Sequence, residues 1–322
     1  MTNVLTNERP VFSIVLPAYN EAANIRELAQ RLVAVAEGLG RPFEIIFVDD
    51  GSSDGTDEIL DQLAEGDARF KPIHFTRNFG HMAALAAGLE TAQASGAVIC
   101  MDADGQHPPE LVPDLVARWE HGAEVVQTIR DATADNGAFK RLSAKMYYRG
   151  LNVLGEVQIP EGSADFRLMA RHVVDTLNAL PERIRFMRGL VPWLGFETGF
   201  VHYEAPQRRR GATKYGFWAM LKLAVDGITS FSHRPLRVAF VLGTVVTFCA
   251  VVYAVVILAC FVSGVALVPG WASIILVVLI LGGIQLFTLG IASEYIARIY
   301  KEVKQRPLYI IRARARRPSD EQ

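Results

Sequence analysis

The chain has 322 residues, and its 33 basic and 34 acidic side chains leave a net charge of -1, which argues against a general polyanion or nucleic-acid binder. Hydrophobic residues make up 51% and the mean hydropathy is +0.21, high for a soluble protein, with the excess concentrated after Arg237. The cysteines Cys100, Cys249 and Cys260 form no spaced set, so we expect reduced thiols, without disulfides or a zinc site. Met1–Arg9 is polar and lacks the apolar core of a cleavable signal peptide.

In the first half of the chain, short β-branched runs alternate with helical patterns, which is typical of βαβ units and a parallel sheet. We expect strands at Phe12–Leu16, Glu44–Val48, Pro72–Phe75, Ala97–Cys100 and Glu124–Thr128. We expect helices at Ile25–Leu39, Asp57–Ala64, His81–Ala94 and Pro109–Glu120. No Gly-x-Gly-x-x-Gly sequence follows the first strand, which counts against a dinucleotide cofactor.

The pattern is weaker after Arg130. We expect a helix at Phe139–Leu154, an extended segment at Ala164–Met169 and a helix at Arg171–Leu180. Further on, six apolar side chains share one helical face, which predicts an amphipathic helix in the membrane interface over residues 216–236. They are Phe217, Met220, Leu221, Ala224, Val225 and Ile228. An ordinary helix whose apolar face packs on a protein core is the alternative.

Two long uncharged segments follow, Val238–Val262 with 25 residues and Trp271–Ser293 with 23. Each is long enough to cross about 30 Å of hydrocarbon, so the pair predicts a transmembrane hairpin rather than a buried helical hairpin of a soluble protein. Both outer flanks are basic, and the stretch Arg298–Arg317 holds eight basic residues and one acid. The positive-inside rule therefore places both ends in the cytoplasm.

These observations divide the chain into four parts. The catalytic α/β domain is expected over residues 1–215, the interfacial helix over 216–236, the hairpin over 237–297 with spans at about 238–262 and 271–295, and a basic cytoplasmic tail over 298–322. Gly282, Gly283 and Gly290 would permit close helix packing in a homo-oligomer.

The loop Met101–His107 follows the fourth predicted strand, at the edge of the sheet where open α/β domains bind ligands. Asp102, Asp104 and Gln106 alternate along it, so all three can point into one site. Two carboxylates completed by substrate oxygens fit Mg²⁺ or Mn²⁺ holding a diphosphate. An Asp-x-Asp pair alone also suits a solvated turn, but its position after a strand favours the metal.

Two further loops end predicted strands. Pro17–Glu21 offers an aromatic face for a base and a carboxylate to orient it. In Asp49–Ser52, a carboxylate can accept hydrogen bonds from a base or ribose, and Gly51 lets backbone approach the ligand. Capping of the next helix by Ser53 or Asp54 is a structural role for the same stretch.

Basic side chains also follow strands. Arg77 can hold a phosphate, whereas Asn78 or Gly80 can simply shape the turn, and Arg130 closes the fifth strand near the sugar or the diphosphate. Asp165 lies in an apolar neighbourhood, where it can orient the acceptor, bind a sugar hydroxyl or pair with Arg167. The basic loop Gln207–Tyr215 can close over a diphosphate, gather a lipid phosphate or anchor to anionic lipid.

Taken together, these motifs resemble those of the polyprenyl-phosphate glycosyltransferases of family 2, a group that includes bactoprenol (undecaprenyl-phosphate) glucosyltransferases and dolichyl-phosphate mannose synthases. The resemblance extends from about Phe12 to Arg306 and rests on Pro17–Glu21, Val48–Thr56, Arg77–Gly80 and Asp102–Glu110. The hairpin narrows it to the bacterial bactoprenol type.

The resemblance implies a GT-A (Rossmann-like) domain and a Mg²⁺ or Mn²⁺ ion bound by Asp102, Asp104 and Gln106. It implies nucleotide-sugar contacts from Pro17, Tyr19, Glu21, Val48, Asp50, Arg77, Ala103 and Arg130. It implies catalytic roles for Asp102, Asp104, Asp165, Arg208 and Lys214. Ser163–Arg167 has the form found in bactoprenol glucosyltransferases, whereas mannose synthases tend to lack an acid at Asp165. The Gln-x-x-Arg-Trp pattern of processive synthases is absent from the sequence, so we expect no chain elongation.

The expected reaction is inverting transfer of one hexose, glucose before others, from a UDP-sugar to undecaprenyl phosphate at the cytoplasmic face of the bacterial inner membrane. The acceptor phosphate is already anionic, because a monoester loses its second proton near pH 6, so it needs no strong base. The alternatives are another sugar (N-acetylglucosamine, galactose, mannose or an aminopentose) and another lipid, whose hydroxyl would need Asp165 as base. A membrane scaffold without activity is disfavoured by the intact acidic loops.

Overall fold

The computed structural model describes residues 9–131, 160–182, 185–204, 232–263 and 270–313. Its centre is a seven-stranded sheet in the order β3-β2-β1-β4-β6-β5-β7. The strands are β1 (Phe12–Ala18), β2 (Phe43–Asp49), β3 (Phe70–His74), β4 (Ala97–Cys100), β5 (Val125–Arg130), β6 (Ser163–Ala170) and β7 (Thr198–Tyr203). Only β6 runs antiparallel to its neighbours among these strands.

The helices of the α/β domain confirm the expected alternation. They are α1 (Ala22–Gly38), α2 (Thr56–Gly66), α3 (His81–Thr91), the 3₁₀ turn η1 (Pro109–Leu111), α4 (Val112–Glu120), α6 (Arg171–Ala179) and α7 (Met187–Trp193). The pattern in the sequence did not predict β7 or α7. The helix expected at Phe139–Leu154 and most of the interfacial helix expected over residues 216–236 lie outside the described residues, and the last three residues of the latter range belong to a longer helix that begins at Arg234.

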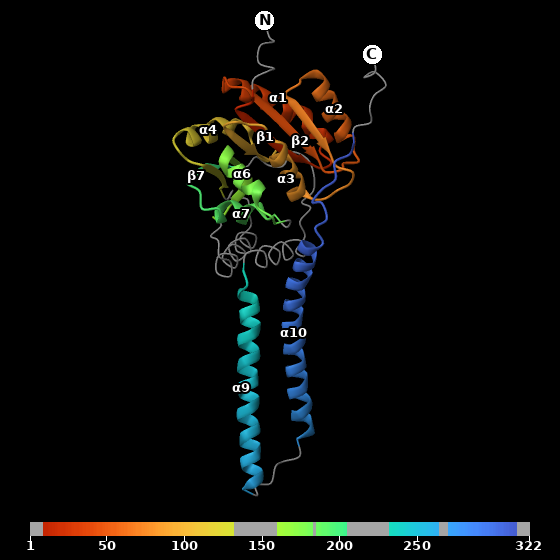
Figure 1. Ribbon diagram of the computed structural model, residues 1–322, viewed down its shortest axis with the longest axis vertical. Coiled ribbons are helices and arrows are strands. Elements are labelled where there is room, and N and C mark those ends of the chain that lie inside the picture. Colours follow the sequence, from red (N-terminus) through yellow and green to blue (C-terminus); the bar gives the residue numbers. More distant parts are fainter. Residues whose placement is uncertain (1–8, 132–159, 183–184, 205–231, 264–269, 314–322) are drawn as a thin grey trace.

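Both faces of the sheet are covered, as Figure 1 shows, and successive residues of β1 divide between them. Ile14 and Leu16 belong to the apolar core under α1, α2 and α4, whereas Val15 belongs to the core under α3, α6 and α7. This alternation follows from the two-residue period of a strand. It explains why the central strands read as continuous apolar runs.

The Ala-rich helix α3 lies very close to the sheet. A Cβ atom at Gly88 would come within 2.2 Å of Cγ1 of Val15, a separation that atoms cannot adopt. Glycine at this position therefore lets α3 pack directly on β1. The close packing fixes the start of α3, at His81, relative to the ends of β1 and β4.

The loops after β1, β2 and β4 meet at one edge of the sheet, because these strands are parallel. The direction of winding changes between β1 and β4, and open sheets of this kind bind ligands at such a point. β6 runs the other way and pairs Arg167 with Cys100 of β4. Its first residues, including Asp165, are thereby brought to the same edge as the loop after β4.

Two long helices, α9 (Arg234–Val262) and α10 (Trp271–Val303), run side by side away from the α/β domain (Figure 1). Each contains a window apolar enough to cross a membrane, Arg234–Val256 with mean hydropathy 2.4 and Ile280–Val303 with 1.4, and neither window is buried. The hydroxyl of Tyr295 on α10 donates to the carbonyl of Ser232 at 2.6 Å, which joins α10 to the residues just before α9.

α9 runs away from the α/β domain and α10 runs back toward it (Figure 1). Beyond α10 the chain continues upward along the domain in Figure 1. We call residues Leu308–Arg312 the return segment. Its Ile311 forms an isolated antiparallel bridge with Phe75, just after β3. The predicted tail from residue 298 on therefore includes the last turns of α10 and the return segment, and its cytoplasmic position stays a prediction.

Candidate active site

The loop after β4 is the centre of the site. Asp102 is about one-third exposed, and its backbone N–H donates to Nδ1 of His107 at 2.8 Å. Asp104 accepts the backbone N–H of Gln106 at 3.0 Å, which closes the turn through Gly105. Ala103 is buried. The loop thus has a fixed shape, with Asp102 next to the start of α3.

The tautomer of His107 follows from these contacts. Because Nδ1 accepts a hydrogen bond from the backbone of Asp102, that nitrogen carries no proton, and its 3.7 Å approach to Oδ2 of Asp102 is not an ion pair. The ring is buried and stacks on Phe166 at a centroid distance of 5.3 Å. His107 is therefore a support for the loop.

Hydrogen bonds join the loops after β1 and β2. Asn20, which has a positive φ of 56°, donates its backbone N–H to Ser52 and accepts the backbone N–H of Ser53 on its side chain, both at 2.9 Å. The backbone N–H of Glu21 donates to Thr56 at 3.0 Å. Tyr19 is 40% exposed beside these contacts. Pro17 and Val48 pair across β1 and β2, so the predicted base pocket has a rigid floor.

Asp50 is almost fully buried, and its carboxylate accepts the backbone N–H groups of Phe79 and Gly80 at 2.6 and 2.9 Å. Burial raises the pKa of Asp50; the two amide bonds oppose this, and the neighbouring Asp49 adds to it. A Cβ atom at Gly51 would lie 2.4 Å from the carbonyl carbon of Arg77, so glycine permits the loops after β2 and β3 to touch.

The capping role considered for this stretch is only partly present. Asp54 accepts the backbone N–H of Thr56 at 3.1 Å, while Gly55 occupies the N-cap of α2 without a side-chain cap. The side chain of Ser53 therefore does not cap α2.

The two exposed arginines that follow strands differ. Arg77 lies over the ring of Phe79 at 3.9 Å and donates to the carbonyl of Asn78 at 2.9 Å, as expected for a residue that shapes the turn. Arg130 ends β5, with its backbone N–H bonded to the carbonyl of Gly162 at 2.9 Å and its side chain exposed. Phosphate binding by either remains a prediction.

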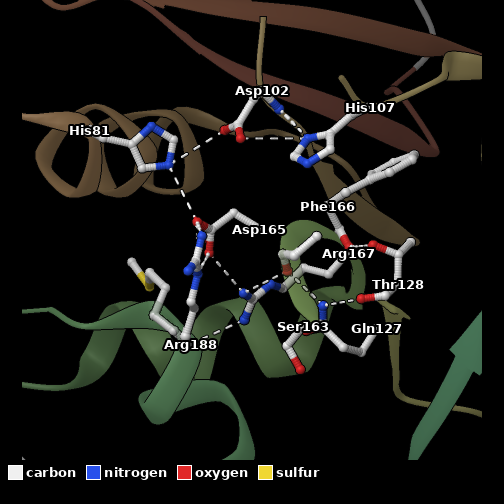
Figure 2. A network of polar contacts seen from close by, with 12 residues as sticks. His81, Asp102, His107, Gln127, Thr128, Ser163, Asp165, Phe166, Arg167 and Arg188 are labelled. Atoms are coloured by element: carbon white, nitrogen blue, oxygen red, sulfur yellow. Dashed lines mark hydrogen bonds and ion pairs between the residues drawn. The ribbon is translucent and has the colours of Figure 1, made fainter. Parts of the chain in front are cut away.

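Figure 2 shows Asp165 at the centre of a charged network opposite the loop after β4. Its carboxylate accepts Nη2 of Arg167 at 3.1 Å and Nη2 of Arg188 at 2.7 Å, while Nε of Arg188 reaches both of its oxygens at 3.1 Å. Nε2 of His81 lies 3.8 Å from Asp165 and 3.5 Å from Asp102. His81 therefore bridges the two acidic positions.

The network fixes the charge of Asp165. Burial by itself would raise the pKa of Asp165, but the charges of Arg188 and Arg167 and the hydrogen bonds from Arg188 outweigh it and hold that pKa well below its usual range. A carboxylate this acidic is a poor proton acceptor at neutral pH. Of the three roles considered for Asp165, the structure provides the pair with Arg167, and it adds Arg188.

Several residues of the predicted site cannot be placed. Arg208 and Lys214 lie outside the described residues, as does the rest of the basic loop. Within the described ranges, no group of three or more His, Cys, Asp and Glu side chains is arranged to hold a metal ion. A site of two carboxylates and one amide, completed by substrate, would not form such a group.

Sequence reasoning did not assign two residues of the network. His81 is the first residue of α3 and lies beside the loop after β4. In the sequence, only its place at the end of the motif Arg77–His81, where a helix was expected to begin, could have indicated a role in the site. Arg188 comes from α7, 23 residues after Asp165, and no periodic pattern connects it with the site.

Comparison with known proteins agrees with this geometry. Residues 13–177 match the glycosyl transferase family 2 model, and residues 234–299 match the GtrB C-terminal hairpin model. The chain therefore belongs to glycosyltransferase family 2. Within that family, it is one of the members that carry the GtrB hairpin, which together with α9 and α10 points to a membrane-associated protein.

Similar proteins cover almost the whole chain. A glycosyltransferase of Bacillus subtilis, YkcC, is 42% identical over 93% of this chain and 93% of its own length. A bactoprenol glucosyl transferase of Shigella phage SfII is 40% identical over 93% and 97% of the two chains. A prophage bactoprenol glucosyl transferase homolog of Escherichia coli K12 is 40% identical over 93% and 98%.

Among solved structures, glucosyl-3-phosphoglycerate synthase of Mycobacterium tuberculosis, in complex with Mn²⁺, UDP-glucose and phosphoglyceric acid, is 20% identical with a TM-score of 0.46, covering 69% of this chain and 79% of that one. The family match and the observed sheet confirm the glycosyltransferase α/β domain expected from the sequence.

Proposed function

We propose that this chain transfers a single glucose residue from UDP-glucose to undecaprenyl phosphate, with inversion at the anomeric carbon. The observation that carries the proposal is that one chain combines a family 2 domain with a GtrB hairpin and matches bactoprenol glucosyl transferases over 93% of its length. Transfer of another sugar, or transfer to another lipid, is the alternative.

A divalent cation, Mg²⁺ or Mn²⁺, fits the loop after β4. Oδ1 of Asp102 is buried and accepts no hydrogen bond, because Nε2 of His81, 3.5 Å away, does not hydrogen-bond to it, and this is costly for a carboxylate unless a ligand completes its contacts. Asp102, Asp104 and Gln106 would hold the ion with oxygen ligands, as Mg²⁺ and Mn²⁺ prefer. When bound, the ion would stabilise the negative charge of the leaving diphosphate.

The state of Asp165 favours a phosphate acceptor over a hydroxyl acceptor. A hydroxyl nucleophile needs a general base whose pKa is near neutrality, whereas the pKa of Asp165 is lowered. The phosphate of a polyprenyl phosphate carries its charge already and needs no such base. Catalysis would then depend on in-line positioning of the phosphate and the anomeric carbon.

The position relative to the membrane is also a proposal. Basic residues flank both apolar helices on the side of the α/β domain, with Arg234 and Arg237 before the first span and Lys301 and Lys304 after the second. The positive-inside rule then places the domain in the cytoplasm, at the bacterial inner membrane, where UDP-sugars and the lipid phosphate meet.

The test is an assay of purified full-length protein with radiolabelled UDP-glucose and undecaprenyl phosphate. We expect Asp102→Ala to reduce turnover by at least about a hundredfold, the scale of losing a group that stabilises transition-state charge. Asp114→Ala, an exposed acid on α4, should leave turnover unchanged. Full activity of Asp102→Ala in the presence of a chelator would contradict the assignment of the loop.

A second set of assays identifies the sugar donor and the lipid acceptor. Released nucleotide is measured for UDP-glucose, UDP-galactose, UDP-N-acetylglucosamine and GDP-mannose, each with undecaprenyl phosphate and with diacylglycerol. We expect turnover with UDP-glucose and the lipid phosphate together. Turnover with diacylglycerol alone would establish the hydroxyl acceptor in place of the proposed one.

A further inference from the structure

The return segment lies beyond both matched regions, the second of which ends at residue 299. Two backbone hydrogen bonds fasten it to the chain after β3. The N–H of Thr76 donates to the carbonyl of Ile310 at 3.0 Å, and the N–H of Arg312 donates to the carbonyl of His74 at 2.7 Å. The return segment thus lies beside the end of β3 and is joined to Phe75, just after that strand, by an isolated antiparallel bridge.

Side chains of the return segment complete the core on the α3 side, where Leu308 and Tyr309 pack. The ring of Tyr309 stacks on the fully buried Phe75, with centroids 5.0 Å apart and planes 10° from parallel. Its hydroxyl donates to Oε2 of Glu90 on α3 at 2.7 Å, and Oε1 of Glu90 accepts Nη1 of Arg185 at 3.1 Å. Tyr309 is therefore held by its ring, which stacks on Phe75, and by its hydroxyl, which hydrogen-bonds to Glu90.

The contacts continue from Tyr309 to the predicted nucleotide pocket. Phe75 meets Phe79 edge to face, with centroids 5.7 Å apart and planes at 88°. The backbone N–H of Phe79 donates to the carboxylate of Asp50, as does that of Gly80. One row of contacts, from Tyr309 through Phe75 and Phe79 to Asp50, joins the segment after the second apolar helix to the acid expected to contact the nucleotide.

Arg312 of the return segment also contacts residues that flank the loop after β2 in the sequence. The guanidinium of Arg312 pairs with Asp57 at 3.1 Å and lies 3.9 Å from Asp49. Asp49 in turn accepts the backbone N–H of Ser52 at 2.9 Å and a hydrogen bond from Nδ1 of His74 at 3.2 Å. The return segment therefore touches both flanks of the loop after β2.

We propose that Tyr309 is a positioning residue for the nucleoside diphosphate of the donor. It supports Phe75 and Phe79, so that the two backbone amides hold the carboxylate of Asp50 in place, and it does so without touching the ligand. The inference rests on the proposed function, that the donor is a UDP-sugar, and on the predicted contact between Asp50 and its nucleoside. It adds that donor affinity depends on a segment encoded after the membrane helices.

The experiment uses full-length protein in lipid nanodiscs and measures UDP binding by calorimetry, together with steady-state kinetics. Tyr309→Leu keeps an apolar side chain on the core but removes the aromatic stack, and Tyr309→Phe keeps the stack and removes only the hydroxyl. Ile310→Ala is the matched control, because that neighbouring side chain is 51% exposed.

We expect Tyr309→Leu to raise the Kd of UDP and the KM for the sugar nucleotide by about three- to tenfold, the scale of one aromatic pair. The KM for the lipid phosphate and kcat should stay unchanged. Tyr309→Phe should recover most of the affinity, and Ile310→Ala should bind UDP as the wild type does.

Unchanged UDP affinity in Tyr309→Leu, with normal binding by the wild type, would overturn the inference. An equal rise of both KM values would also overturn it, since that pattern means that the substitution disturbs both substrate sites alike. A lower kcat with both KM values and the Kd of UDP unchanged means only a loss of folded protein and would overturn it too. Failure of the wild type to bind UDP would instead count against the proposed function. If Tyr309→Leu does not fold, Tyr309→Met, which fills the same space with a flexible apolar side chain and removes the ring, decides the matter by amide hydrogen exchange: unchanged protection of Phe79 and Gly80 would count against Tyr309.

Discussion

At the scale of single residues, the site has one acid that is free to take a ligand and one that is not. Oδ1 of Asp102 is buried without a hydrogen-bond partner, whereas both oxygens of Asp165 are occupied by arginine donors. His81 lies between them. The two groups are the same carboxylate, and their neighbours in the fold give them different chemistry.

The effect of pH on Asp165 follows from its lowered pKa. Such a group stabilises the folded state at pH values above its unfolded pKa, near 3.9, and this stabilisation fades only as the pH falls through the lower folded value. We therefore expect Asp165→Asn to lower activity by the same factor at every pH from 5 to 9. It should also destabilise the fold by about 3–5 kcal/mol, because Arg167 loses its buried partner.

Activity and thermal unfolding of the purified variant check both statements. Asp175→Asn is the control, since Asp175 forms an exposed pair with Arg171 that is worth less than about 1 kcal/mol. A wild-type to variant activity ratio that changes about tenfold per pH unit within this range would identify Asp165 as a titrating base instead.

At the scale of elements, the parts predicted from sequence are those with a strong local pattern. β1, β2 and β4 are buried along their whole length and mostly apolar because both faces of the sheet are covered, and α1 repeats apolar residues at helical spacing. β7 has no such pattern. It lies at the edge of the sheet, most of its side chains are exposed or half-buried, and it contains a glycine.

The site was predictable to the same extent. Loops that directly follow apolar strands, such as those at Asp50 and Asp102, could be found because strand ends mark them. Arg188 and Tyr309 could not. They reach the site through α7, a seven-residue helix containing Pro192, and through a segment separated from the domain by two long helices. Tertiary contacts alone bring them there.

The close packing of α3 on β1 gives a test at this scale. We expect Gly88→Ala to lower the free energy of unfolding by about 1–3 kcal/mol, because the added methyl group overlaps Val15. Adding Val15→Ala to that variant should recover part of the loss. Thermal unfolding followed by tryptophan fluorescence measures both effects.

Gly38→Ala at the end of α1 is the matched control, because a Cβ atom there meets nothing within 4 Å. We expect it to be neutral or slightly stabilising. Identical melting temperatures for Gly88→Ala and the wild type would mean that α3 can move away from β1 without cost.

At the scale of the whole molecule, two apolar helices leave the α/β domain and the chain returns to that domain (Figure 1). The 33 residues of α10 extend about 50 Å, more than the hydrocarbon thickness of a bilayer. The connection between the helices is therefore expected on the far side of the membrane from the domain.

Cysteine labelling in intact bacterial cells tests this arrangement. In a background where the three native cysteines are alanine, Ser263→Cys, at the end of α9, should react with a membrane-impermeant maleimide added outside. Glu58→Cys, exposed on α2, should react only after the cells are broken open. The reverse labelling pattern would place the α/β domain outside the cytoplasm.

The position of the return segment also has a consequence for biosynthesis. The ribosome synthesises the α/β domain first, then the two apolar helices, and after them the residues that cover Phe75. Until translation has passed the return segment, that aromatic surface is uncovered and the core of the domain is incomplete. A message truncated after the second apolar helix would therefore produce a polypeptide in which the proposed sugar-nucleotide pocket is unfinished.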